Sequence, residues 1–258
     1  MAEPMLALDF DEPDVSHLIT EDDTPVDNWF QGRQRDLLCD VLRSSWSPGF
    51  PYIAASDVAI FYAVKPGIAP DLLLSLNVEI PEDYHKKNRR SYFVWSFGKV
   101  PDLVIEIVSN KIGGEDTEKL QTYRDIRIPY YVIFDPFHFL SSRAIRIFQL
   151  NALNYVERVD RAFSDLGLGL TLWDGTFDGM EGNWLRWTDA DGALLETGLE
   201  RSAREALRAE SEAHRAQAEA HRADEAQTRA DQERARADEE QARRESLEQR
   251  LRDLGLEP

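Results

Sequence analysis

The sequence contains a single cysteine and no apolar run of the length needed to cross a membrane. One cysteine cannot form a disulfide or a cysteine-based metal site within one chain. Cys39 stands among Leu37, Leu38 and Val41, which is typical of a core residue. The N-terminus also lacks the basic-then-apolar order of a secretory leader, so we expect a soluble, cytoplasmic protein with no membrane partner.

Basic residues are scarce, with 30 Lys and Arg against 48 Asp and Glu and a net charge of −18. Binding to phosphate backbones is a summed cationic effect, so this balance argues against a general nucleic-acid coat. It leaves room for a local basic patch, or for carboxylates gathered around a cation. A serine hydrolase is poorly supported, because the chain has no Gly-x-Ser-x-Gly segment and its histidines are scattered.

The composition divides the chain into three parts, and 258 residues suffice for one ordinary domain with appendages. Residues 1–26 carry many acids and no Lys or Arg, which predicts a disordered arm. Residues 27–198 have the mixed composition of a folded domain. Residues 199–254 are rich in Ala, Glu and Arg, with Arg and Ala recurring at seven-residue spacing, which predicts a long helix. A coiled coil and a solvated single helix are both open for this tail.

Residues 101–136 form the centre of the predicted fold. The apolar runs at 103–108 and 131–134 are typical of strands buried on both faces, and a helix is expected between them from Thr117 to Arg127. Strand, helix and strand in this order predict a parallel βαβ unit. Around it we expect a helix capped by Asp27 or Asn28 and running to about Ser44, strands at 52–62 and 70–76, and a hairpin from 144–150 and 155–159. The predicted fold class is therefore α/β.

Three charged residues in this region point to chemistry. Glu106 lies inside a buried strand, where a carboxylate costs several kcal/mol unless it is paired, protonated or bound to a metal. Asp71 heads a neighbouring strand, and Lys119 lies in the first turn of a helix, on the face towards the sheet and against the helix dipole. Each has a structural explanation alone, as an ion pair or a turn residue. Together they have the parts of a metal-dependent phosphodiesterase.

Further candidates lie around this group. Gln34 falls on the buried face of the first helix, and Asp57 falls on the inward face of the predicted strand 52–62, so both are candidates for the edge of the site. The long excursion at 79–99 carries the densest cationic run in the chain, which we expect to contact nucleic-acid phosphates: Lys86, Lys87, Arg89 and Arg90. The aromatic residues beside this run stack on bases or anchor the loop.

Several motifs resemble the Uma family of restriction endonuclease-like proteins, in the PD-(D/E)XK nuclease superfamily. They are Pro70-Asp71, Pro101-Asp-Leu-Val-Ile-Glu106-Ile-Val-Ser, Lys119-Leu-Gln-Thr-Tyr123 and Tyr130-Tyr-Val-Ile-Phe-Asp135-Pro136, and the likeness runs from residue 28 to residue 198. The resemblance implies a restriction-endonuclease-like mixed sheet flanked by helices.

The same resemblance implies a DNA endonuclease that uses Mg²⁺ or Mn²⁺. Asp71 and Glu106 would be its metal ligands, and Lys119 would be its third catalytic residue. In the wider superfamily the lysine stands two residues after the glutamate, where this chain has Val108. The resemblance implies that the lysine has moved to the following helix.

Two hypotheses about function remain open. The first is an Mg²⁺-dependent endonuclease that hydrolyses DNA phosphodiester bonds, which the intact set of Asp, Glu and Lys favours. The second is a catalytically inactive nuclease-like scaffold that presents its helical tail to a protein partner, which the acidic balance and the long tail favour. A homodimer and another helix are both candidate partners for the tail.

Overall fold

The computed structural model describes residues 28–63, 67–86 and 90–253. The predicted arm at 1–26, and Lys87 and Arg89 of the cationic run, lie outside the described residues. Contacts divide the chain into two compact units, one ending at Gly198 and the other beginning at Leu199. The candidate chemistry lies in the first unit.

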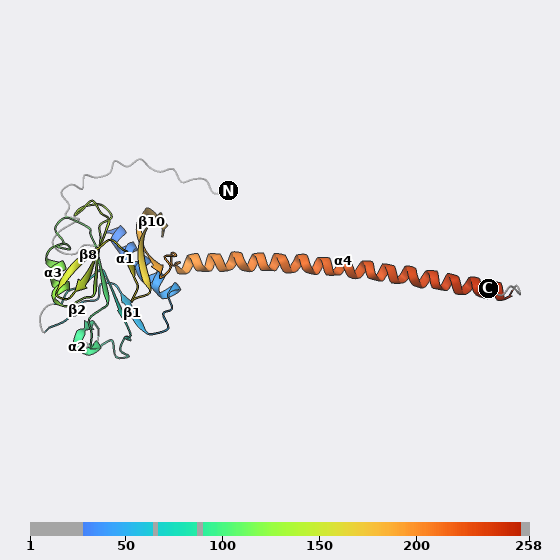
Figure 1. The fold of residues 1–258 in the computed structure, drawn as a ribbon, viewed down its shortest axis with the longest axis horizontal. Coiled ribbons are helices and arrows are strands. Elements are labelled where there is room, and N and C mark those ends of the chain that lie inside the picture. The colour runs from blue at the N-terminus through green and yellow to red at the C-terminus, as the bar shows by residue number, and fades with distance from the viewer. Residues whose placement is uncertain (1–27, 64–66, 87–89, 254–258) are drawn as a thin grey trace, which may run out of the picture. The chain divides into compact units, whose positions relative to one another are not determined.

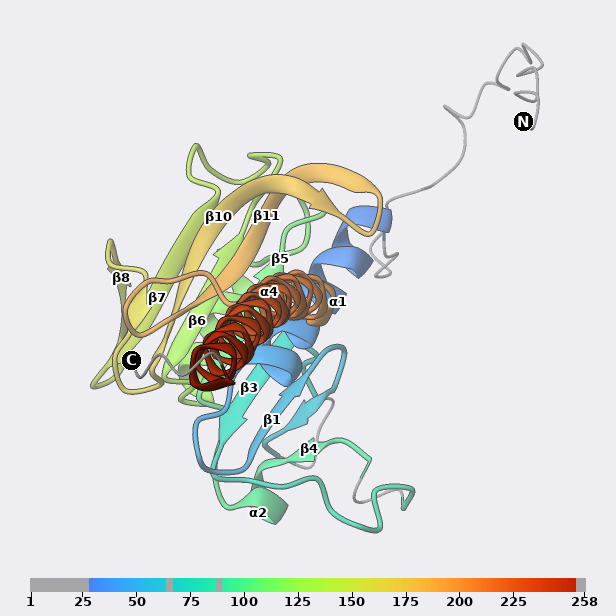
Figure 2. The same cartoon turned by 90° about the vertical axis from the view of Figure 1, so that its right-hand side faces the viewer.

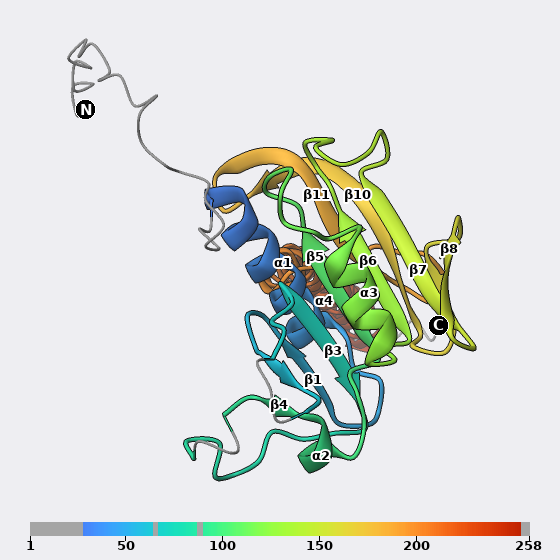
Figure 3. The same ribbon diagram turned by 90° about the vertical axis from the view of Figure 1, so that its left-hand side faces the viewer.

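A six-stranded mixed sheet forms the centre of the first unit (Figures 1 and 3). Its order is β1 (Tyr52–Ala55), β3 (Leu72–Leu76), β5 (Leu103–Ile107), β6 (Tyr130–Phe134), β7 (Ile145–Asn151) and β8 (Asn154–Arg158). Strands β5 and β6 are parallel, and the other neighbours are antiparallel. This mixed sheet confirms the predicted α/β class, and the parallel βαβ unit and the hairpin are also confirmed.

Helix α3 (Glu118–Asp125) makes the crossover between β5 and β6, and it is shorter than the predicted helix. Ile126 is the C-cap, and Arg127 then adopts a left-handed conformation with φ of 71°. A non-glycine residue in that region cannot continue an α-helix. The chain therefore turns at Arg127 and enters β6 three residues later.

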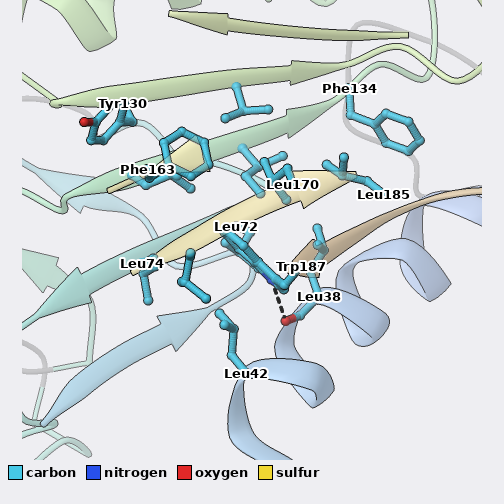
Figure 4. Close-up of a cluster of buried hydrophobic side chains, with 14 of the residues drawn as sticks. Leu38, Leu42, Leu72, Leu74, Tyr130, Phe134, Phe163, Leu170, Leu185 and Trp187 are labelled. Carbon is cyan, nitrogen blue, oxygen red and sulfur yellow. Dashed lines mark hydrogen bonds between the residues drawn. The ribbon is translucent and has the colours of Figure 1, made fainter. Parts of the chain in front are cut away.

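One face of the central sheet packs against α1 (Trp29–Ser45) and a second sheet of β9 (Ala162–Phe163), β10 (Leu168–Phe177) and β11 (Met180–Asp189) (Figure 2). Alternate residues such as Leu72, Leu74 and Ile105 point to this core. Figure 4 shows the core, in which the Trp187 indole donates to the Leu38 carbonyl at 3.1 Å. Helix α1 starts as predicted, with the Asn28 side chain accepting from the Gln31 amide at 2.8 Å.

The opposite face of the same strands packs against α3 (Figure 3). Leu73, Val104 and Tyr131 alternate with the residues of the first core, so the period of two along each strand divides the side chains between two apolar layers. Glu106 is two residues from Val104 and faces α3. The buried carboxylate therefore belongs to the α3 layer.

The predicted strand 52–62 is wrong as a single element. It is divided into β1 and a short β2 (Ile60–Phe61), and Asp57 between them has φ of 55°. A residue with that backbone breaks the extended conformation, so the inward-facing alternation does not reach Asp57. Strand β2 pairs instead with β4 (Tyr92–Phe93), which leads into α2 (Val94–Phe97) inside the excursion at 79–99.

Helix α4 (Gly198–Asp253) makes up the described part of the second unit. It is 56 residues long and has no buried residue, in accord with its few large apolar side chains. Ion pairs at i,i+4, such as Arg208 with Glu212, lie along it. Its self-association stays a prediction. In the described part of the chain, no helix combines the length and the apolar character that crossing a membrane requires.

Candidate active site

The register between β3 and β5 places two acids opposite each other. Leu72 pairs with Ile105 and Leu73 with Val104, so the next step of this antiparallel register sets Asp71 opposite Glu106. Directly opposed residues on one face have Cβ atoms about 5 Å apart. Both side chains are buried, and the Ile107 amide next to Glu106 donates to Asp71 Oδ2 at 2.7 Å.

Glu106 has a hydrogen-bond donor on each carboxylate oxygen. The Tyr123 hydroxyl donates to Oε1 at 2.6 Å, and Lys119 Nζ donates to Oε2 at 3.0 Å. Only 1% of Glu106 is exposed. Burial raises its pKa to about 8, although the positive charge of Lys119 acts in the opposite direction. This carboxylate therefore binds a proton readily unless a further cation stabilises its charge.

Lys119 lies between two carboxylates at the start of α3. Its Nζ is 3.0 Å from Glu106 Oε2 and 3.3 Å from Glu115 Oε1. Burial alone lowers the pKa of this ammonium group, but the charges of Glu106 and Glu115 outweigh burial and raise the pKa to about 12. Lys119 is therefore a fixed positive charge at neutral pH.

Asp71 is held by helix α1 as well as by β5. Gln31 Nε2 donates to Asp71 Oδ1 at 3.1 Å and also approaches the Ile107 carbonyl at 3.3 Å. The Arg35 guanidinium lies 3.5 Å from the same carboxylate oxygen. Burial raises the pKa of Asp71, while the Ile107 amide and Arg35 act to lower it.

The two residues expected at the edge of the site have other positions. Gln34 is fully buried against β11, where its side-chain amide donates to the Leu185 carbonyl at 2.8 Å and accepts from the Leu185 amide at 2.9 Å. Asp57 has a largely exposed side chain and accepts from Arg35 at 2.6 Å. Gln34 is thus in the core, and Asp57 shares Arg35 with Asp71 as an ion-pair partner.

Gln31 and Arg35 were missed as site residues, although one signal could have indicated them. They are spaced i,i+4 on α1, so they share a face of the helix, and both are polar beside a strongly apolar stripe. Tyr123 and Glu115 were also missed. Tyr123 lies on the face of α3 that carries Lys119, and its hydroxyl contacts Glu106. Glu115 lies in the turn before α3 and contacts Lys119.

The described part of the cationic run lies on the surface. Lys86 is exposed and pairs with Asp83 at 3.0 Å. Arg90 is exposed and lines an apolar cavity of about 240 Å³, together with Leu73 of β3 and Tyr84. Leu73 is two residues from Asp71 and on the same face of the sheet, so this cavity opens on the α3 side.

Asp102, beside Pro101, has a structural role at the other end of β5. Its Oδ2 atom accepts from the Leu76 amide at 2.8 Å and from Lys99 Nζ at 2.5 Å. These contacts tie the start of β5 to the end of β3. Asp102 is therefore separated from Glu106 by most of the strand.

The oxygen atoms around Asp71 and Glu106 fit a hard divalent cation. Asp71 and Glu106 are opposed in the register of β3 and β5, and the carbonyl of Ile107 follows Glu106 in the strand. Mg²⁺ is usually held by one or two carboxylates with water and substrate phosphate. Among the described residues, no three His, Cys, Asp or Glu side chains form a metal-binding cluster. The protein thus offers two carboxylates, and both have pKa values raised by burial, as expected where a cation would offset their charge.

Comparisons with known proteins place the chain in a family. Among solved structures, the chain is similar to a protein from Anabaena variabilis ATCC 29413 described as "a putative nuclease belonging to DUF820", with 15% sequence identity, a TM-score of 0.34, and coverage of 53% of this chain and 71% of that chain. No curated protein matches the chain. The Uma2 family model, described as "Putative restriction endonuclease", matches residues 11–172. This match spans more than half of the sequence, and the chain therefore belongs to the Uma2 family.

Proposed function

We propose that this protein is an endonuclease that hydrolyses phosphodiester bonds in DNA and uses Mg²⁺ or Mn²⁺. The observation that carries this proposal is the convergence of two opposed acids and a lysine: Asp71 at the head of β3, Glu106 in β5 and Lys119 in α3. Family membership supports the nuclease class, and the donor set supports the cation.

In this proposal Asp71 and Glu106 hold the cation, and the surrounding residues orient them. Tyr123 holds one oxygen of Glu106, while Gln31 and the Ile107 amide hold Asp71. Such partners fix the rotamers of ligating carboxylates and commonly account for 10- to 100-fold in metal affinity. A bound divalent cation would lower the pKa of water and offset the negative charge of the phosphate.

Lys119 acts as a fixed charge in this reaction. Hydrolysis joins a water oxygen to phosphorus and breaks the bond to the leaving oxygen, which takes up a proton. A lysine with a pKa of about 12 cannot accept the proton of water at neutral pH. Its N–H groups can instead donate to the charged oxygens that develop at phosphorus, which is electrostatic stabilisation of the transition state.

The excursion at 79–99 is the proposed phosphate-binding surface. Arg90 and Lys86 are exposed, and Arg90 lies on the sheet face that also carries Asp71. The proposal includes Lys87 and Arg89 on the sequence alone.

Cleavage of supercoiled plasmid DNA tests the proposal. The wild-type protein should cut in Mg²⁺ or Mn²⁺ and lose the activity in EDTA. Asp71→Asn and Glu106→Gln should lose both cleavage and metal binding measured by calorimetry, since each removes a ligating charge. Glu118→Gln is the matched control, because Glu118 is an exposed acid on α3 near the site. Equal cleavage by the wild type and the Glu106 variant would show that this site assignment is wrong.

The inactive scaffold is the second candidate function, and one observation favours it. Helix α4 has no buried residue and is exposed from Arg201 to Asp253, as expected for a segment that meets a partner. In this case no DNA or RNA would be cut under any metal condition, and the isolated tail would bind another helix with the affinity of the full chain. Detection of metal-dependent cleavage that Asp71→Asn abolishes would exclude the inactive scaffold.

A further inference from the structure

Glu115 is a buried acid next to the proposed catalytic lysine. Only 5% of it is exposed, although it lies in the connection between β5 and α3. Its Oε1 atom is 3.3 Å from Lys119 Nζ. No described residue donates a hydrogen bond to its Oε2 atom, which is also buried. A carboxylate buried for stability alone normally has partners on both oxygens.

The surrounding chain holds this carboxylate in position. The Tyr131 hydroxyl of β6 donates to the Glu115 carbonyl at 2.7 Å, and the Lys119 amide donates to the Gly114 carbonyl at 2.9 Å. Gly113 leaves the space that the carboxylate occupies, because a Cβ atom at that position would lie 2.1 Å from Glu115 Oε1. The hydrogen bond from Tyr131, the backbone bond from Lys119 to Gly114 and the space beside Gly113 together define one position for the Glu115 carboxylate.

Two carboxylates therefore restrain Lys119 from different elements. Glu106 approaches from β5 and Glu115 from the turn before α3. A single ion pair leaves a long lysine side chain several rotamers, whereas two anchored acceptors restrict the direction of its ammonium group. Electrostatic catalysis depends on such preorganisation, because a donor that must reorient loses part of its effect.

We propose that Glu115 is a positioning residue of the active site, which acts by holding Lys119 beside Glu106. This inference deepens the proposed function and rests on it. Glu115 would contact neither the cation nor the phosphate, so its removal should reduce turnover without weakening binding of metal or DNA.

A double-mutant cycle with Glu115→Gln and Lys119→Ala tests this role. Glu115→Gln should lower kcat by 10- to 100-fold, with KM for DNA and Mg²⁺ affinity within about threefold of the wild-type values. In the Lys119→Ala background the same substitution should have no further effect on kcat. Gly113→Ala should reproduce the loss because its Cβ displaces the carboxylate. Glu118→Gln, which removes an exposed acid from the same helix, should be active.

Two outcomes would overturn the proposal. One is full turnover by Glu115→Gln, and the other is an additive loss in the double variant. Urea unfolding without metal gives a measurement that does not need activity. It is applied to the wild type, Glu115→Gln, Lys119→Ala and the double variant. If the wild type cleaves no DNA, the proposed function fails, and the unfolding midpoints then decide only whether Glu115 is coupled to Lys119. Non-additive midpoints would support its coupling to Lys119, and additive midpoints would contradict it.

Discussion

At the scale of single residues, the most informative feature of the protein is the burial of the Glu106 carboxylate. The side chain lies in a central strand, where an apolar residue would be the stable choice. Among the described residues, Lys119 is the charged group that donates a hydrogen bond to it. Replacing a buried ion pair by apolar residues is often neutral or stabilising. Stability therefore does not explain this buried carboxylate. Residues with strongly shifted pKa values cluster at functional sites, so Glu106 is a candidate functional residue.

The raised pKa of Glu106 predicts a pH-dependent stability in the absence of metal. Its ordinary pKa is 4.5, and burial raises the value to about 8 in the folded protein. Between these values the folded state keeps a proton that the unfolded state has released. The free energy of unfolding should therefore fall as the pH rises from 5 to 8, by roughly 1–4 kcal/mol. Lys119 stays charged in both states across this window and should add no slope.

Glu106→Gln should remove most of this slope and stabilise the metal-free protein at pH 8. The amide has nearly the shape of the carboxyl group and carries no charge to desolvate. Urea unfolding at pH 5 and pH 8 in EDTA measures both effects, with Glu118→Gln as the exposed control. A variant that keeps the wild-type slope would show that another group titrates in this range.

Lys119→Ala should separate metal binding from turnover. The ammonium group donates to Glu106 and cannot ligate a cation, so calorimetric Mg²⁺ affinity should be retained or slightly increased. Cleavage should fall by about 10²- to 10³-fold, the scale of one lost transition-state donor. Lys119→Arg keeps the charge with a different geometry and should recover only part of the rate. Cleavage by Lys119→Ala at the wild-type rate would remove Lys119 from the mechanism.

At the scale of elements, the described part of the excursion at 79–99 exposes large apolar side chains beside cations. Its described residues form only β4 and α2, and several of its apolar side chains, including Ile80, Tyr84 and Trp95, are exposed. Trp95 lies against Phe93, with 5.2 Å between ring centroids, and Tyr84 lines the cavity beside Leu73, so these partly exposed side chains also anchor the loop. In the proposed function, a nucleic acid would contact the exposed parts of these rings and the cations, because bases stack on aromatic side chains and phosphates pair with cations.

Replacing Lys86, Lys87, Arg89 and Arg90 by Ala should weaken DNA binding to a similar degree for different sequences. The slope of log K against log salt should flatten by up to about 0.9 for each lost phosphate contact. Fluorescence anisotropy at several salt concentrations, with catalysis blocked by Ca²⁺ or by Glu106→Gln, gives this slope. A control with Arg208, Arg215, Arg222 and Arg229 of α4 replaced by Ala removes the same charge elsewhere. Equal slopes for the wild type and the loop variant would exclude the loop as the phosphate-binding surface.

At the scale of the whole molecule, the two units depend on different physics. The first unit buries apolar side chains in two layers, one on each face of the central sheet. Helix α4 buries none and is supported by local ion pairs and by the high helix propensity of Ala, Glu and Arg. The free energy of folding of the first unit should therefore owe little to the tail.

A chain that ends at Gly198 should keep the thermal transition of the full-length protein within a few degrees. Calorimetry measures the transition, and circular dichroism should show lower fractional helicity for the shorter chain. An insoluble product, or the loss of most of the transition enthalpy, would contradict this independence. A chain truncated within α4, after Arg229, is the control for effects of shortening alone.

Local patterns in the sequence determined most of the elements. The continuous apolar runs predicted β3, β5 and β6. The sequence offered Asp27 or Asn28 as the cap of α1, and the structure has Asn28 in that position. Asp135-Pro136 after β6 is a local turn signal, and Asp135 accepts from the backbone amides of Phe139, Leu140 and Ser141. The helix of the tail could be predicted because its composition and its seven-residue period are properties of neighbouring residues in the sequence. These signals depend on neighbours within a few residues, so no knowledge of distant contacts was needed.

The tertiary structure decided which side chains meet. Asp71 is set opposite Glu106 by the register of two strands whose paired residues Leu72 and Ile105 are 33 positions apart in the sequence. A shift of one residue would place the two acids on opposite faces. The choice of Gln31 over Gln34 depends on how α1 is rotated against β5 and β11. The contact of Glu115 with Lys119 depends on the path of the turn around Gly113. These contacts depend on the packing of whole layers. Burial of both faces of the sheet fixes the register of β3 against β5 and the rotation of α1 at the same time.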